Sequence, residues 1–188
     1  MAGIGAHNTQ ERYGWVAIAF HWAIAVLVIG QWLLGEAMHE WVSDRNLRFE
    51  LFQWHKSVGL LILLLAIARI LWRIKEPVPR PPADQPLWQV RLSRIVHWSL
   101  YALIILMPLS GWLRVSTAER QLPIMFFDLF EVPKLMGPNK ALSDFFHEAH
   151  EVMATLILVL VILHVAGALY HHFIRRDDVL RRMLGIAR

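Results

Sequence analysis

The chain contains no cysteine among its 188 residues. This absence excludes disulfide bonds, CxxC redox motifs, thiolate zinc sites, cysteine-ligated iron–sulfur clusters and the covalent attachment of c-type haem. Charge is also scarce, because 18% of the residues are charged and 56% are hydrophobic, with a mean hydropathy of +0.42. These values lie outside the range of an ordinary soluble domain, so the composition indicates a membrane protein.

The basic residues do not indicate nucleic-acid binding, although the sequence has a pI of about 9.8 and a formal net charge of +4. They lie at the edges of apolar segments, where Lys and Arg contact lipid headgroups and set membrane topology. We therefore expect membrane lipid, and no nucleic acid, as a partner.

Four apolar segments are each close to the roughly 20 residues that a membrane-spanning helix needs. They predict helices over about 13–35, 52–73, 92–113 and 145–173. The flank of the first segment carries Glu11 and Arg12, which favours a retained helix over a cleaved signal peptide. The expected fold is therefore all-α, with residues 1–188 forming a single membrane domain built as a transmembrane four-helix bundle.

The connections between these helices differ in character. The stretch KEPVPRPPADQP, over 75–86, is proline-rich and predicts an extended loop between the second and third helices. The connection over 114–144 is the longest, and we expect its stretch IMFFDLF to lie on the membrane surface.

The positions of Lys and Arg predict the orientation of the bundle. The second loop and the C-terminal tail carry basic residues, namely Arg73, Lys75, Arg80, Arg91, Arg175, Arg176, Arg181, Arg182 and Arg188. The first loop, in contrast, has two basic residues against four acidic ones. Because positive loops stay inside, both chain termini are predicted to be cytoplasmic and the protein to cross the membrane several times.

Histidines inside apolar segments are the most unusual feature, since ionisable side chains are costly in a membrane and are usually functional. His21 lies about 9 Å, and His164 about 13 Å, from the predicted inner edge, using the helical rise of about 1.5 Å per residue. His55 and His150 both lie near the predicted outer edge. His150 and His164 are 14 residues apart on one helix, so they face within about 40° of the same direction. The histidines therefore form one inner and one outer pair.

Small neighbours support the same four histidines. A bound porphyrin needs room on the helix face, and residue i+4 lies on the face of residue i. The i+4 neighbours of His21, His55, His150 and His164 are Ala25, Gly59, Ala154 and Ala168. The same position is occupied by a larger residue for His97, His147, His171 and His172, whose roles stay open. We predict two haems, each with its iron bound by one histidine pair.

Several alternatives stand beside this hypothesis. An intramembrane histidine can simply form hydrogen bonds between helices, and small neighbours can simply permit close packing. A histidine-lined transporter is another possibility, although such transporters usually have carboxylates in mid-membrane. The stretch HEAHE lacks the spacing of a zinc protease, because Glu151 stands four residues after His147. His7 and His39 are expected to be solvated.

Short motifs along the chain give a resemblance to a known family. They are HW at His21, HKSVG, RILWR, PVPRPP, LMPLSG, AHE, LH and YHHF. Together, from Tyr13 to the C-terminal tail, they resemble the bacterial cytochrome b561 family. The resemblance implies a four-helix, di-haem b cytochrome of the inner membrane that exchanges electrons with ubiquinone, some members being superoxide oxidases. It implies the iron ligands His21, His55, His150 and His164, and no separate catalytic residue.

Cations near each haem level are further candidates. For the haem propionates at the inner level the candidates are Arg69, Arg73, Arg94, Arg176 and the polar His97. For steering superoxide at the outer face they are Arg45, Arg48, Lys56, Arg114, Arg120, Lys134 and Lys140. A protein electron donor is the alternative partner, which would make the chain the b-type subunit of a membrane hydrogenase or formate dehydrogenase.

Overall fold

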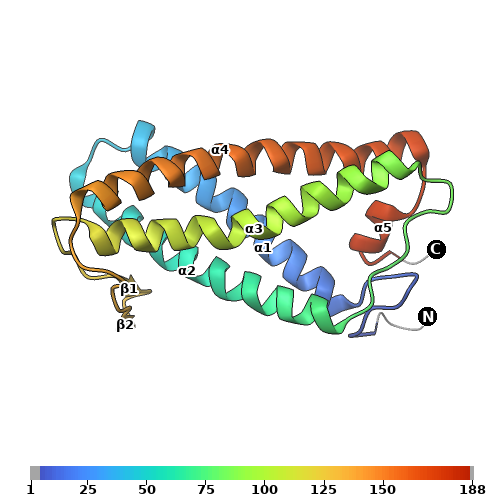
Figure 1. Ribbon diagram of the computed structural model, residues 1–188, viewed down its shortest axis with the longest axis horizontal. Helices are drawn as coiled ribbons and strands as arrows, with labels where there is room; N and C mark the ends of the chain where they lie inside the picture. Colours follow the sequence, from blue (N-terminus) through green and yellow to red (C-terminus); the bar gives the residue numbers. More distant parts are fainter. Residues whose placement is uncertain (1–4, 187–188) are drawn as a thin grey trace.

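Four long helices form an elongated bundle in the computed structural model, which describes residues 5–186 (Figure 1). They are α1 (Trp15–Glu36), α2 (Arg45–Lys75), α3 (Leu87–Thr117) and α4 (Lys140–Tyr170). Two π-helical turns follow α1 and α4, namely η1 (Ala37–Trp41) and η2 (His171–Arg175), and α5 (Val179–Met183) is a short terminal helix. All four long helices are long and apolar enough to cross a membrane, which confirms the predicted helical membrane bundle.

Three of the helices extend well beyond the predicted bounds. The helices α2, α3 and α4 each have 31 residues, about 46 Å of helix, whereas a hydrocarbon core is about 30 Å thick. The predictions followed only the apolar runs, so they missed polar turns that continue each helix past the membrane core. Capping sets two of the new start points: the side chains of Asp44 and Asn139 accept hydrogen bonds from Leu47 N–H at 2.8 Å and Leu142 N–H at 3.1 Å.

The chain ends meet at one end of the bundle, which we call the termini end. There the N-terminal segment, the loop between α2 and α3, and the segment after α4 lie together (Figure 1). The backbone N–H of Arg80 donates to Gln10 O at 2.9 Å, and the Trp22 indole donates to Met183 O at 2.9 Å. Both described chain ends are therefore on the same side of the bundle, and their cytoplasmic location stays a prediction.

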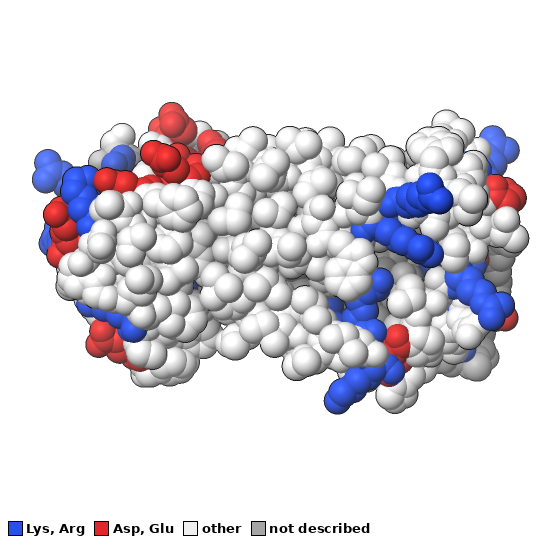
Figure 2. Space-filling view, in the orientation of Figure 1, with Lys and Arg blue, Asp and Glu red and all other residues white. Residues whose placement is uncertain are grey.

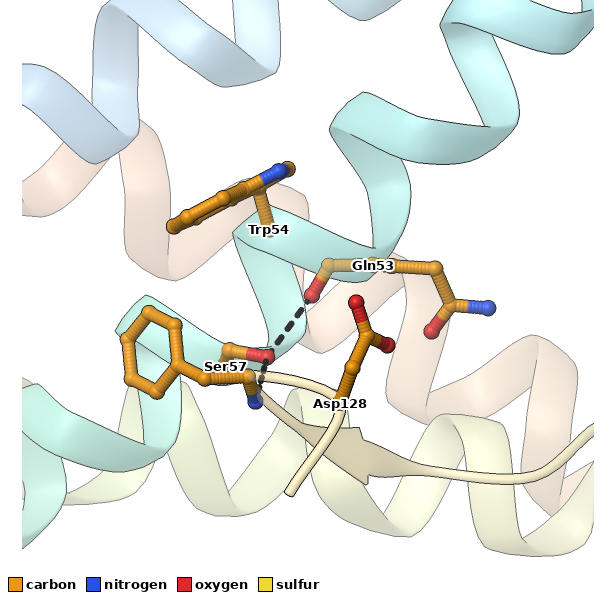
Figure 3. A pocket seen from close by; sticks show the side chains of 5 residues that line it. Gln53, Trp54, Ser57 and Asp128 are labelled. Carbon is orange, nitrogen blue, oxygen red and sulfur yellow. Dashed lines mark hydrogen bonds between the residues drawn. The ribbon is translucent and has the colours of Figure 1, made fainter. Parts of the chain in front are cut away.

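A small β-hairpin marks the opposite end, which we call the hairpin end. The strands β1 (Met125–Phe126) and β2 (Phe130–Glu131) pair antiparallel, within the segment that the sequence placed on the membrane surface. The hairpin loop spans 127–129, and Phe127 and Asp128 in it have left-handed backbone conformations with φ values of 48° and 59°. The Ser57 hydroxyl accepts a hydrogen bond from Phe127 N–H at 3.0 Å, which fastens the hairpin to α2 (Figure 3).

Charge is distributed unequally between the two ends, and the middle of the visible face is free of it (Figure 2). Among the described residues, eleven basic and five acidic residues belong to the termini end, against seven basic and ten acidic residues at the hairpin end. The apolar middle of the bundle is the part that meets the hydrocarbon core.

Candidate functional site

The first histidine pair lies toward the termini end. The ring centroids of His21, on α1, and His164, on α4, are 5.9 Å apart. His97, on α3, also lies against His164, with the ring centroids 5.2 Å apart. The structure therefore brings His21 and His164 together as the sequence predicted, and adds His97, which the i+4 criterion had set aside.

The second pair lies toward the hairpin end. The ring centroids of His55, on α2, and His150, on α4, are 6.2 Å apart. His147 does not join them, because its Nε2 atom lies 3.5 Å from Glu151 on its own helix. Two imidazole pairs thus stand at two depths of the bundle, and α4 contributes one member to each.

Haem fits these pairs by distance. An imidazole nitrogen binds a first-row metal ion at about 2 Å, so two nitrogens on opposite sides of one ion stand about 4 Å apart. The ring centres lie farther out on either side, which agrees with centroid separations of 5.9 and 6.2 Å. The spacing of the helices also leaves room for haem. The helix α3 packs closely along α4, whereas α1 and α2 have far fewer backbone contacts with α4. The paired histidines bridge the more widely spaced helices.

The free nitrogen atoms also suit iron. The Nδ1 atom of His150 lies 3.1 Å from Met107 O and 2.9 Å from the Ser110 hydroxyl, and the Nδ1 atom of His21 lies 3.2 Å from the Arg69 guanidinium. The His150 contacts leave its Nε2 atom free for a metal ion. A guanidinium can only donate, so a His21 that bound iron through Nε2 would carry its proton on Nδ1, and Arg69 would be a neighbouring charge rather than a hydrogen-bond partner. A metal-binding histidine typically uses one nitrogen for the metal and the other for a protein partner. This donor set therefore fits haem iron.

A glycine on α3 gives the hairpin-end pair its space. A Cβ atom on Gly111 would stand 3.1 Å from His150 Cε1 and 3.4 Å from His150 Nδ1. Any larger side chain there would displace the imidazole. Sequence reasoning missed Gly111, because it lies on another helix from the histidine it accommodates, and the stretch LMPLSG by itself does not show which ring faces it.

The cations predicted for the inner level occupy different surroundings. Arg69 contacts His21 and lies over the Tyr101 ring, 5.2 Å from its centroid. Arg73 lies over the rings of Trp98 and Tyr101, at 5.9 and 5.4 Å. Arg94 and Arg176 are exposed. Arg69 and Arg73 form no ion pair with a carboxylate among residues 5–186, so both guanidinium groups are free to meet an anionic group such as a haem propionate.

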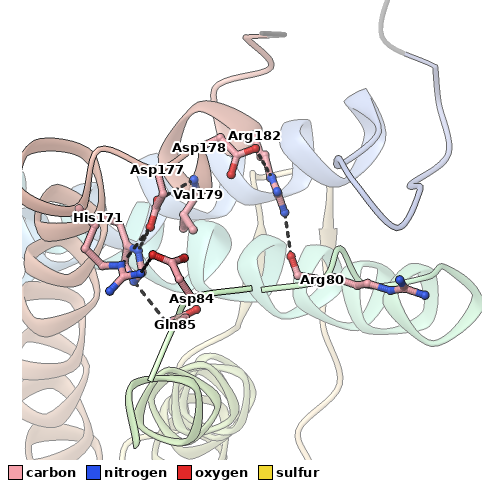
Figure 4. A network of polar contacts seen from close by, with 9 residues as sticks. Arg80, Asp84, Gln85, His171, Asp177, Asp178, Val179 and Arg182 are labelled. Atoms are coloured by element: carbon pink, nitrogen blue, oxygen red, sulfur yellow. Dashed lines mark hydrogen bonds and ion pairs between the residues drawn. The ribbon is translucent and has the colours of Figure 1, made fainter. Parts of the chain in front are cut away.

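His171 belongs to a polar network at the termini end (Figure 4). Its Nδ1 atom lies 2.5 Å from the Asp177 carboxylate, and the Arg175 guanidinium reaches Asp84 at 2.6 Å. The Arg182 guanidinium pairs with Asp178 at 2.9 Å and donates a hydrogen bond to Arg80 O at 2.8 Å. This network joins η2 and α5 to the loop between α2 and α3. His172 lies against Phe173 and takes no part in it.

Two imidazole pairs in a four-helix membrane bundle are the arrangement typical of a membrane cytochrome b. The family model of the prokaryotic cytochrome b561 matches residues 12–185. The chain is 38% identical to cytochrome b561 homolog 2 of Escherichia coli K12, over 95% of this chain and 94% of that protein. It is 29% identical to the probable superoxide oxidase CybB of Yersinia pestis, over 93% and 97% of the two chains. The chain belongs to the prokaryotic cytochrome b561 family.

Membership in this family assigns the protein a general role. It is a haem-binding, multi-pass protein of the bacterial inner membrane that takes part in electron transport. The alternative of a histidine-lined transporter is thereby set aside.

Proposed function

We propose that this protein is a two-haem b cytochrome that transfers electrons from superoxide at the hairpin end to ubiquinone. His55 and His150 hold one haem, and His21 and His164 hold the other. The observation that carries the proposal is the presence of two imidazole pairs at two depths, with ring centroids 6.2 and 5.9 Å apart. Haem supplies one-electron transfer when bound, and two histidine ligands leave its iron no open position for a substrate.

The overall reaction balances without further cofactors. Two superoxide anions release two electrons and leave as two molecules of O2. Ubiquinone takes up two electrons and two protons to become ubiquinol. The likeness to the protein named probable superoxide oxidase supports the choice of donor. The protein's own task is to hold the redox centres between its helices and to admit each substrate to one side.

Local charge, rather than the whole hairpin end, must attract superoxide. The hairpin end has more acidic than basic residues, and several of its cations already have partners. Lys140 pairs with Asp144 at 2.6 Å, Lys56 donates to Pro123 O at 3.2 Å, and Arg48 binds Val42 O. Arg114 is half-buried and close enough to His150 and His55 to act on both electrostatically. We therefore assign the local attraction to Arg114.

Stopped-flow mixing of the purified oxidised protein with a superoxide source tests the function. We expect rapid haem reduction that superoxide dismutase abolishes, and reoxidation with turnover when ubiquinone is added. Haem reduction no faster than in the dismutase-treated sample would contradict the superoxide assignment. It would favour a protein donor, which co-purification from native membranes would then identify.

Replacing Arg114 tests the source of the attraction. Arg114→Gln should lower the rate constant for reduction by superoxide several-fold at low salt, because a nearby cation raises the local concentration of an anion. The difference from the unmodified protein should shrink as ionic strength rises, since salt screens the charge. Arg120→Gln, at an exposed position of the same end, is the matched control and should change the rate much less.

A further inference from the structure

Among the four paired histidines, His21 and His150 have Nδ1 atoms with protein partners, and these partners are of opposite character. At the termini end, the Nδ1 atom of His21 lies 3.2 Å from the guanidinium of Arg69. A guanidinium can only donate hydrogen bonds, and it carries a permanent positive charge. At the hairpin end, the Nδ1 atom of His150 lies 3.1 Å from the carbonyl oxygen of Met107, which can only accept. The Ser110 hydroxyl donates to the same carbonyl at 2.7 Å, so its oxygen is available to accept from His150.

These partners act differently on a ligand imidazole. An Nδ1–H group that donates to a carbonyl makes the opposite nitrogen a stronger base, which stabilises ferric iron. A His21 that binds iron through Nε2 carries its proton on Nδ1, and Arg69 cannot accept that proton. The inner ligand therefore gains no such support, and the guanidinium acts only as a nearby charge. Ferric haem also carries one positive charge more than ferrous haem, and a neighbouring cation therefore favours the ferrous form. Both effects stabilise the reduced state at the termini end and the oxidised state at the hairpin end.

The surrounding charges also favour the reduced state at the termini end over the reduced state at the hairpin end. At the termini end, Arg69 and Arg73 lie over Tyr101 and have no carboxylate ion pair among the described residues. At the hairpin end, Arg114 is the cation that acts on His150, and it is opposed by Glu151 on α4. No carboxylate of the described residues thus compensates the positive charge at the termini end, whereas Glu151 partly offsets that at the hairpin end.

We propose that Arg69 is a positioning residue that sets the direction of electron transfer. By its positive charge beside His21 it raises the reduction potential of the termini-end haem above that of the hairpin-end haem, whose ligand His150 is held by Met107 and Ser110. Electrons that enter at the hairpin end then settle at the termini end. This inference rests on the proposed function, because it requires the four histidines to hold two haems.

Optical redox titration of the purified protein tests the role of Arg69. In Arg69→Gln, the ratio of ferrous to ferric haem at the termini end should fall about tenfold at a given ambient potential, equivalent to about 59 mV for one electron. The potential of the hairpin-end haem should stay unchanged. Arg69→Lys keeps the positive charge and loses the planar guanidinium beside His21. The potential of its termini-end haem should therefore lie between those of Arg69→Gln and the unmodified protein. If Arg69→Gln retains too little haem, Arg69→Lys and the unmodified protein still give the comparison.

Arg73→Gln is the matched control. Arg73 is also a cation over Tyr101, but it lies against the Trp98 ring and not against a paired histidine. It should lower the termini-end potential less than Arg69→Gln does. An equal effect of the two variants, an equal shift of both haems, or no shift in Arg69→Gln and Arg69→Lys would each overturn the inference.

Ser110→Ala tests the opposite end. It removes one acceptor from His150, so the hairpin-end potential should rise while the termini-end potential stays the same. A fall, or no change, would contradict the proposed role of this contact. The failure of the inference differs from the failure of the function: a protein with fewer than two haems contradicts the function, whereas two haems with potentials indifferent to Arg69 contradict only the inference.

Discussion

The four paired histidines can be tested one at a time, because each pair is proposed to hold its own haem. His164→Ala should remove the termini-end haem, or convert it to high spin, and largely spare the hairpin-end haem. His55→Ala should do the reverse. The physical reason is that, under this proposal, each iron is held by two imidazoles from different helices, so the loss of one ligand opens one site only.

Pyridine haemochrome analysis and optical spectra measure the outcome of these replacements. The unmodified protein should contain two haems per chain, and each variant about one low-spin haem. His147→Ala is the matched control on α4, since its imidazole lies beside Glu151 and outside both pairs. One haem per unmodified chain, or haem loss in His147→Ala as great as in His150→Ala, would contradict the assignment.

The close approach of α3 and α4 makes a second site-specific test possible. Gly111→Leu should lose most of the hairpin-end haem, because even a Cβ atom at this position stands 3.1 Å from the His150 ring. The termini-end haem should be retained, since Gly111 contacts only the other pair. Haem content and the low-spin spectrum measure both effects.

Gly30→Leu provides the control for this prediction. Gly30 lies inside α1, is exposed, and would have no atom within 4 Å of an added Cβ. A leucine there faces open space on the outside of the bundle, so the haem content should stay at the level of the unmodified protein. Equal losses in the two variants would show that glycine itself, and not the room beside His150, was needed.

The loops at the termini end hold the N-terminal segment through a carboxylate that senses pH. The His7 imidazole lies 2.7 Å from Glu76, and Asn8 N–H donates to the same carboxylate at 2.8 Å. The hydrogen bond from His7, followed by that from Asn8, lowers the pKa of Glu76 below its usual value. His7 also stacks on Trp72, with ring centroids 5.4 Å apart.

A lowered carboxyl pKa in the folded state predicts how this contact depends on pH. Its stabilising effect is fully present above the ordinary pKa of a glutamate and is lost as pH falls through the lowered pKa. Limited proteolysis of the N-terminal segment should therefore be slow at neutral pH and faster in acid. Glu76→Gln should be cleaved faster at neutral pH and should show less acceleration in acid. An unchanged pH profile in Glu76→Gln would assign the acid sensitivity to another group.

The charge difference between the two ends predicts the orientation of the entire bundle. Eleven basic and five acidic residues belong to the described part of the termini end, and membrane proteins keep the more basic side in the cytoplasm. A reporter enzyme active only in the periplasm should be inactive when fused after the C-terminus and active when inserted at Gly137, in the loop before α4. The opposite pattern would place the hairpin end in the cytoplasm and would reverse the proposed direction of electron transfer across the membrane.

The helical bundle and the choice of candidate histidines could be predicted from the sequence, because both follow from local patterns. Apolar runs of membrane-spanning length require helices, since a lipid-exposed backbone must satisfy its own hydrogen bonds. Helical rise and rotation then fix which histidines share a depth and a face. The ends of the helices could not be predicted in the same way, because the polar turns outside the membrane depend on caps such as Asp44 and Asn139.

By itself, the sequence determined that the chain is a membrane protein, that it has four helices, and that two sets of histidines recur at two depths. Only the tertiary structure decided what each ring touches. The contacts of His21 with Arg69, of His150 with Met107 and Ser110, and of the His150 ring with Gly111 all join different helices. They depend on the rotation and separation of packed helices, and no local pattern along one segment specifies these.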